Sequence, residues 1–155
     1  KDERMKRILI IYKSVHKGNT EKIAEAMGEY MGGDVFRVDD IDVSILLDYD
    51  IIGFGSGIYF GKHHKSLLEF IDDIEKLEKK TFIFSTRSIT PPRIAHRTLR
   101  KKLMDKEASI VGEFSCKGEN EAGPFKLVGG ICRGRPNEED IERAISFAET
   151  TKKLA

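Results

Sequence analysis

The chain has 155 residues, a length that fits one domain and leaves no room for two large ones. Hydrophobic residues make up 39% of it, enough to bury a core without disulfides or metal ions. Lys and Arg number 27 against 26 Asp and Glu, a net charge of +1. This balance argues against a nucleic-acid-binding protein that relies on excess positive charge, although a local basic face remains compatible with it.

No apolar stretch approaches the roughly 20 residues of a membrane span, and no signal peptide is evident. Cys116 and Cys132 are too few for a disulfide framework or a zinc site and lack CxxC spacing, so we expect free thiols in a reducing compartment. We therefore expect a cytoplasmic protein that binds neither nucleic acid nor membrane. Residues 1–4 precede Met5 and are expected to be an expression remnant or an extended start, which leaves one domain at 5–155.

Short apolar runs alternate with amphipathic segments along the chain. The runs predict strands at residues 7–12, 34–38, 50–54, 81–85 and 108–114. Apolar residues at helical spacing predict four helices: one stopped at Gly32, one carrying Leu67 through Leu77, one entered at Pro91, and one capped by Asn137. Buried strands that are each followed by a helix or turn indicate a doubly wound parallel α/β sheet with helices on both faces.

In such a sheet, ligands bind beyond the carboxyl ends of the strands, which here means the loops at 13–20, 55–62 and 85–93. The first loop offers hydroxyls at Ser14 and Thr20, a glycine for close approach, and amides at a helix N-terminus, which together can cradle a phosphate. The alternative is an ordinary strand-to-helix turn in which Asn19 or Thr20 caps the helix. The loop has neither the Walker A pattern nor the GxGxxG pattern.

Four segments resemble the flavodoxins. They are the phosphate loop IYKSVHKGNTEKIAEAM, the second loop DYDIIGFGSGIYFGK, the third loop FIFSTRS, and the ending GRPNEEDIERAISFAE. Together they cover nearly all of residues 5–154, in the order and spacing that the family shows. The resemblance implies a flavodoxin-like five-stranded parallel sheet with the strand order 2-1-3-4-5.

The same resemblance implies a non-covalently bound flavin mononucleotide (FMN). The residues that it assigns to the phosphate are Ser14, His16, Lys17, Gly18, Asn19 and Thr20. Those that it assigns to the flavin ring are Gly57, Ile58, Tyr59, Phe60 and Gly61 from the second loop, and the backbone of Ser85, Thr86, Arg87 and Ser88 from the third. It further implies a glycine-containing peptide that turns over on reduction, for which Phe60–Gly61 is the candidate; the alternative is that Gly57 and Gly61 only shape a turn. The first loop is one residue longer than the family's common form, and the third lacks an aromatic residue.

The aromatic and imidazole side chains near these loops have competing interpretations. Tyr59 and Phe60 follow a buried strand, so we expect one of them in the core and Tyr59 on the flavin. His63 and His64 begin a helix, and we expect them to be solvated rather than catalytic. His96 lies in a basic helix with no evident partner.

Charged residues are unevenly distributed along the chain. Residues 55–68 and 82–104 contain no acid, whereas six acids lie within residues 34–50. We therefore expect positive charge beside the flavin, with Arg87 nearest its pyrimidine end. The long segment from Cys116 to Pro136 lacks periodicity, and we expect it to cover the flavin or to form a subunit contact.

Two classes of function remain open at this stage. The first is an FMN-dependent electron carrier, or a small FMN-dependent reductase, and a carrier is favoured over an enzyme with its own substrate. The second is a flavodoxin-shaped binding module without flavin. The expected partner is a redox protein with an acidic surface or a small anionic substrate, and the chain is expected to be a monomer or a dimer.

Overall fold

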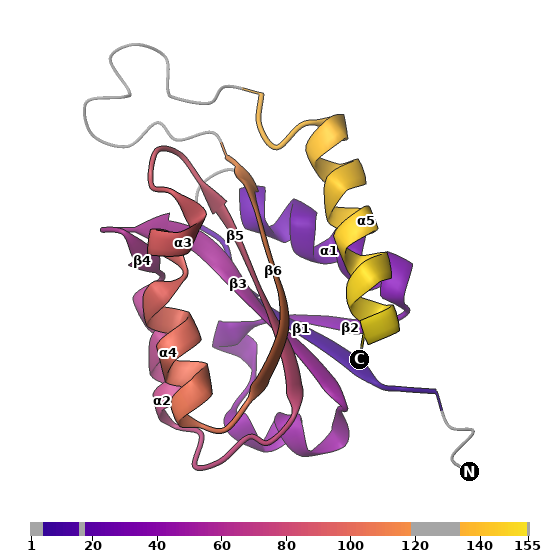
Figure 1. The fold of residues 1–155 in the computed structure, drawn as a ribbon, viewed down its shortest axis with the longest axis vertical. Helices are drawn as coiled ribbons and strands as arrows, with labels where there is room; N and C mark the ends of the chain where they lie inside the picture. The colour runs from indigo at the N-terminus through magenta and orange to yellow at the C-terminus, as the bar shows by residue number, and fades with distance from the viewer. Residues whose placement is uncertain (1–4, 16–17, 119–133, 155) are drawn as a thin grey trace.

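The structure is a computed structural model that describes residues 5–15, 18–118 and 134–154. Its sheet contains five long strands, which are β1 (Ile8–Lys13), β2 (Asp34–Arg37), β3 (Ile51–Tyr59), β5 (Lys80–Arg87) and β6 (Ser109–Lys117). These strands are parallel in the order β2-β1-β3-β5-β6, so the expected topology is confirmed (Figure 1). An additional strand, β4 (Lys62–His63), pairs antiparallel with the end of β3 and forms a hairpin.

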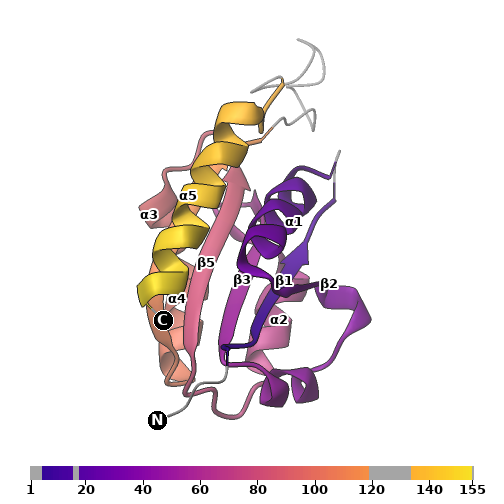
Figure 2. The same cartoon turned by 90° about the vertical axis from the view of Figure 1, so that its right-hand side faces the viewer.

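Helices cover both faces of the sheet. Helices α1 (Asn19–Met31) and α5 (Glu138–Leu154) lie on one face, and α2 (Lys65–Asp72), α3 (Pro92–Ala95) and α4 (Arg97–Asp105) lie on the other (Figures 1 and 2). Two short 3-10 helices, Val38–Asp40 and Val43–Asp48, connect β2 to β3. None of the described helices is long and apolar enough to cross a lipid bilayer.

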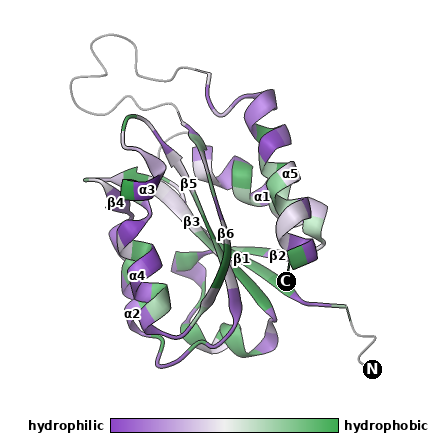
Figure 3. Ribbon diagram, in the orientation of Figure 1, coloured by the Kyte–Doolittle hydropathy of each residue, from purple (hydrophilic) through white to green (hydrophobic). Residues whose placement is uncertain are grey.

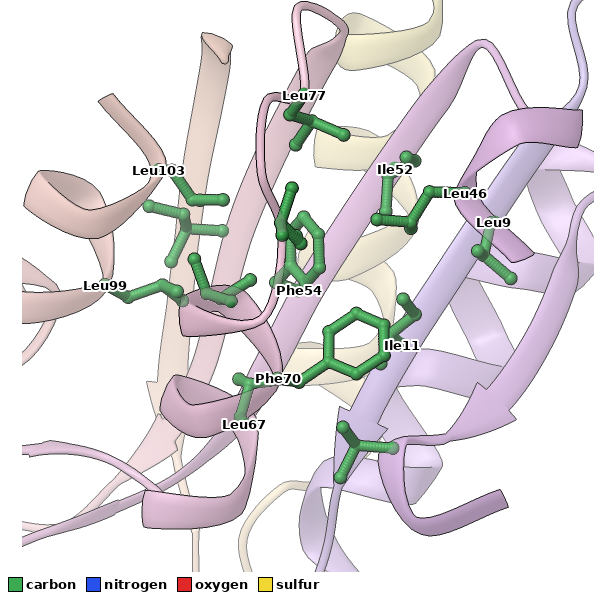
Figure 4. Close-up of a cluster of buried hydrophobic side chains, with 14 of the residues drawn as sticks. Leu9, Ile11, Leu46, Ile52, Phe54, Leu67, Phe70, Leu77, Leu99 and Leu103 are labelled. Atoms are coloured by element: carbon green, nitrogen blue, oxygen red, sulfur yellow. The ribbon is translucent and has the colours of Figure 1, made fainter. Parts of the chain in front are cut away.

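The central strands are buried on both faces, which explains their continuous apolar sequence (Figure 3). Successive side chains of a strand point to opposite faces and so supply two cores. The core under α2 and α4 contains Ile11, Phe54 and Leu99, among others (Figure 4). The core under α1 and α5 contains Phe82 and Phe84. Each fully buried side chain of this size contributes about 1.5–3 kcal/mol to folding.

The strands extend further than the apolar runs predicted. Strand β3 continues through the predicted glycine-rich loop to Tyr59, because Gly53 and Gly55 leave room for rings of the neighbouring strand. A Cβ atom on Gly53 would lie 2.2 Å from the ring of Phe82, and one on Gly55 would lie 2.3 Å from the ring of Phe84. These glycines are packing positions inside a strand, and the second loop therefore begins only at the hairpin.

Two helix boundaries also differ from the sequence expectation. Helix α2 ends at Asp72, so Ile74 and Leu77 are buried from the connection that follows it. The final helix begins as expected, because Asn137 Oδ1 accepts a hydrogen bond from the Asp140 amide at 3.0 Å. Asp140 accepts one from the Asn137 amide at 2.9 Å, which completes a reciprocal cap.

Candidate functional site

The carboxyl ends of the parallel strands bring the three predicted loops to one edge of the sheet. In register, Lys13, Ser56, Ser85 and Ser115 form one row across β1, β3, β5 and β6. Gly57, Thr86 and Cys116 form part of the next row toward the edge. Small and polar residues thus replace the apolar core where the strands end. This edge is the candidate site.

The first turn of α1 opens onto this edge. Gly18, the N-cap residue, has a left-handed backbone (φ +62°) and, as a glycine, no side chain that could cap the helix. Ser14 Oγ accepts a hydrogen bond from the Glu21 amide at 3.4 Å. The helix N-terminus therefore retains the partial positive charge that favours an anion. His16 and Lys17, which were also assigned to this loop, lie outside the described residues.

A buried hydroxyl pair joins this helix to β5. Thr20 Oγ1 and Thr86 Oγ1 are 2.8 Å apart, and their residues are 1% and 5% exposed. Their shared hydrogen bond uses one of the two hydroxyl hydrogens, and the other can be donated to a ligand. A Cβ atom on Gly118 would lie 3.0 Å from Asn19 Nδ2 and 3.1 Å from Thr86 Cβ, so glycine lets the end of β6 approach both. The donors and the glycine fit a phosphate group.

The resemblance assigns the backbone of Thr86 to the flavin ring, whereas the Thr86 side chain faces the phosphate loop. Alternation along β5 could have indicated this, because Phe82, Phe84 and Thr86 share a face with α1. The backbones of Ser85, Thr86 and Arg87 belong to β5, and the Arg87 carbonyl accepts a hydrogen bond from the Gly118 amide at 2.9 Å. Of the four assigned residues, Ser88 alone lies beyond the end of the strand.

The hairpin between β3 and β4 presents the two aromatic residues. Its two-residue turn consists of Phe60 (φ +53°) and Gly61 (φ +79°), and the Phe60 side chain is fully exposed. Tyr59 is partly exposed and lies over Gly57, where a Cβ atom would be 2.9 Å from the Tyr59 hydroxyl. Neither ring lies in the core, so the expectation that one of them does is wrong. Ile58 is also partly exposed on this hairpin.

The expectation of a solvated His63 is wrong, whereas His64 is partly exposed. His63 is 1% exposed, and its Nε2 donates to the Phe84 carbonyl oxygen at 2.9 Å. Burial, assisted by the neighbouring His96, lowers the pKa of His63 to about 3. His64 packs its ring edge-to-face with Tyr59, at 5.0 Å between centroids, and its Nδ1 accepts a hydrogen bond from the Ser66 amide. The hairpin is thereby anchored at its base.

His96, which had no evident partner in the sequence, is 1% exposed and bonded on both sides. Its Nε2 lies 2.7 Å from Ser85 Oγ, and its Nδ1 lies 2.9 Å from Glu113 Oε1. It joins α3 to α4 and packs at 5.1 Å between ring centroids from His63. These partners come from residues distant in the sequence, so no local sequence pattern predicts them.

The remaining groups at the edge carry charge or sulfur. Lys13 Nζ donates to Asp39 Oδ2 at 2.8 Å, and this hydrogen bond lowers the pKa of Asp39. The side of the edge formed by β1 and β2 is therefore neutralised. Cys116 is a free, buried thiol, whose pKa burial raises to about 12. Cys132 lies outside the described residues, which contain no cluster of three side chains that could bind a metal.

Comparisons with known proteins agree with this architecture. A family model described as a flavodoxin domain matches residues 9–123. An uncharacterised protein of Methanocaldococcus jannaschii is 49% identical over 146 residues, which cover 94% of this chain and 97% of that protein.

Solved structures share the fold. Flavodoxin 2 from Bacillus cereus has a TM-score of 0.74 at 23% identity, with 96% of this chain and 99% of that chain covered. The Fusobacterium nucleatum flavodoxin has a TM-score of 0.70 at 14% identity, with 97% and 99% covered. The rubredoxin oxygen:oxidoreductase of Desulfovibrio gigas has a TM-score of 0.75 at 15% identity, with 96% of this chain but only 35% of that longer chain covered. Because the family model covers well over half of its length, this chain belongs to the flavodoxin family.

Proposed function

We propose that this protein binds FMN non-covalently at the carboxyl edge of its sheet and acts as an electron carrier in the cytoplasm. Membership of the flavodoxin family supports this, as does the Fusobacterium nucleatum relative, whose structure is of a flavodoxin bound to flavin mononucleotide. The observation that carries the proposal is the buried Thr20–Thr86 hydroxyl pair beside the first turn of α1. Bound FMN supplies the redox chemistry, while the protein binds and orients it.

The phosphate end of FMN would be held by α1 and its preceding loop. Thr20 or Thr86 donates the hydroxyl hydrogen that their mutual bond leaves over, and the helix N-terminus adds its partial positive charge. Ser14 lies at the same turn, with its oxygen toward the Glu21 amide and its hydrogen available to the ligand. Gly18, Asn19, His16 and Lys17 complete the proposed phosphate loop.

The ring end would lie against the hairpin. Tyr59 and Phe60 are the aromatic candidates for stacking, and Gly57 and Gly61 allow the backbone to approach the ring. Just after β5, Ser88 is the candidate for backbone contacts to the pyrimidine edge, because the preceding three residues pair within the sheet.

The proposed partner is a redox protein with an acidic surface. Arg93 and Arg97 are exposed near the carboxyl end of β5 and form no ion pair with the part of the chain that the structure describes. By contrast, Arg100, Lys101 and Lys102 of α4 pair with Glu113, Asp105 and Asp72. Unpaired positive charge at the edge would steer an anionic surface toward the flavin.

A comparison of FMN with riboflavin tests this site. Thr20→Val removes a hydroxyl while keeping the shape of the side chain. Because a hydrogen bond to a charged group contributes roughly 1.5–3 kcal/mol, FMN should bind about 10- to 100-fold more weakly. Riboflavin, which lacks the phosphate, should bind as it does to the wild type. The matched control is Thr151→Val, which changes a buried threonine on α5 and should leave both affinities unchanged.

Titration by flavin fluorescence measures the four affinities. Equal weakening of FMN and riboflavin by Thr20→Val, or no weakening of either, would remove Thr20 from the phosphate site. A wild-type protein that binds no flavin would contradict the proposed function itself. If the FMN-loaded protein alone oxidises NAD(P)H steadily, its function is that of a small FMN-dependent reductase rather than that of an electron carrier.

A further inference from the structure

A chain of polar side chains crosses the sheet on the face opposite the Thr20–Thr86 pair. Arg87 Nε donates to Ser115 Oγ at 2.9 Å, and Ser115 Oγ lies 2.8 Å from Ser85 Oγ. Ser85 Oγ lies 2.7 Å from His96 Nε2, and His96 Nδ1 lies 2.9 Å from Glu113 Oε1. We call these five residues the relay. It connects the carboxyl ends of β5 and β6 to the junction of α3 and α4.

Glu113 fixes the direction of the hydrogen bonds. Its partial burial favours the neutral form, but the hydrogen bonds that His96 and Arg100 donate outweigh this effect and lower its pKa to about 2. The ionised carboxylate can only accept, so His96 donates through Nδ1, and in the neutral imidazole Nε2 is left to accept. Ser85 then donates to His96, Ser115 donates to Ser85, and Arg87 donates to Ser115. Each hydroxyl donates once and accepts once.

The relay has the side-chain types of a serine hydrolase triad, but its burial excludes that chemistry. Ser85 is 0% exposed, and its oxygen already accepts the hydrogen bond from the Ser115 hydroxyl. A nucleophilic serine must reach its substrate, and this one is buried between the sheet and the junction of α3 and α4. An arginine instead donates hydrogen bonds at each end of the relay. Arg100 donates to the Glu113 carboxylate, and Arg87 donates to Ser115.

We propose that His96 is a positioning residue for Arg87, acting through Ser85 and Ser115 to hold its guanidinium at the carboxyl edge of β5. Arg87 forms no ion pair with the described residues, so this hydrogen bond is the contact that orients it. Its consequence rests on the proposed function: an oriented positive charge at this edge favours reduced FMN, which is an anion, over oxidised FMN. The groups that face His96 are Glu113, Arg100 and His63, and they lie on β6, α4 and β4.

The first experiment uses the protein without FMN and nitrogen-15 NMR. The wild-type His96 ring should show a protonated Nδ1 and an unprotonated Nε2 at neutral pH. The Arg87 Nε–H should exchange with solvent at least tenfold faster in Ser115→Ala, whereas Ser115→Thr, which keeps the hydroxyl, should restore slow exchange. The opposite His96 tautomer, or exchange that Ser115→Ala does not change, would overturn the proposal whether or not the protein binds flavin.

The second experiment measures the midpoint potential of bound FMN. Its difference from the potential of free FMN gives the ratio of the affinities for reduced and oxidised FMN. Ser115→Ala should lower this ratio about threefold, a fall of about 14 mV in the two-electron midpoint potential. The same substitution should have no effect in an Arg87→Ala background. In an Arg97→Ala background, which loses an exposed charge outside the relay, the threefold effect should persist. An equal effect in all three backgrounds would overturn the link between Ser115 and Arg87.

Discussion

At the residue scale, Phe60 combines two features that oppose stability. Its side chain is fully exposed, and its backbone has the left-handed φ of +53° that glycine and asparagine adopt at lower cost. We predict that Phe60→Asn raises the free energy of unfolding of the FMN-free protein by about 1 kcal/mol and weakens FMN binding. Urea denaturation and flavin titration measure the two effects. Lys62→Asn on the adjacent strand is the control and should change neither quantity markedly.

The Phe60 result separates a structural role from a binding role. A loss of stability in Phe60→Asn would mean that the ring contributes packing that its exposure does not reveal. A gain of stability with unchanged FMN affinity would remove Phe60 from the ring site and leave Tyr59 as the aromatic candidate there.

His63 makes stability depend on pH. The unfolded chain protonates this histidine near its ordinary pKa of about 6.5, whereas the folded protein resists protonation until about pH 3. Between these values the unfolded state binds more protons, so stability falls as the pH falls, by at most about 1.4 kcal/mol per pH unit. His63→Gln should flatten this dependence, as measured by urea denaturation from pH 7 to 4, at about half-unit steps. His64 is partly exposed, so the control His64→Gln should retain most of the dependence of stability on pH. If His63→Gln retains it as well, His63 is not its source.

At the element scale, β3 depends on a close fit with β5. A methyl group on Gly53 would lie 2.2 Å from the Phe82 ring, which is buried and cannot move aside freely. Gly53→Ala should therefore destabilise the protein by about 1–3 kcal/mol, as overpacking does. Adding Phe82→Leu should recover part of that loss, so that the double mutant is more stable than the sum of the single changes predicts. Denaturation of the four proteins gives this coupling energy, and simple additivity would refute the fit.

The same strand shows what the sequence could predict and what it could not. The apolar runs correctly predicted the five main strands, because burial on both faces leaves a continuous hydrophobic signal. Their order in the sheet was implied only by the resemblance to the flavodoxins, and the structure confirms it. The run ended at Phe54 because the next residues are small and polar, although the ladder continues to Tyr59. The relay was missed for a different reason. His96 and Ser85 lie 11 positions apart, and Glu113 comes from another strand, so only the tertiary fold joins them.

For the molecule as a whole, the net charge of +1 gives little long-range attraction for either sign of partner. Charge near the candidate site is nevertheless asymmetric. On the β1 side, Lys13 is paired with Asp39, whereas on the β5 side Arg93 and Arg97 are exposed and form no ion pair within the described ranges. If FMN binds at this edge, local rather than net charge should govern its reactions with charged molecules.

Two small oxidants of opposite charge test that expectation without knowledge of the natural partner. The FMN-loaded, reduced protein should be oxidised by anionic ferricyanide at a rate that falls severalfold as the ionic strength rises from about 0.01 M to about 1 M, because the Debye length shortens from about 30 Å to about 3 Å. Oxidation by cationic hexaamminecobalt(III) should become faster over the same range. Arg93→Ala with Arg97→Ala should reduce both salt effects, whereas Lys153→Ala, near the far end of α5, should not. Rates that respond to salt identically for the two oxidants would show that this local charge does not guide electron transfer.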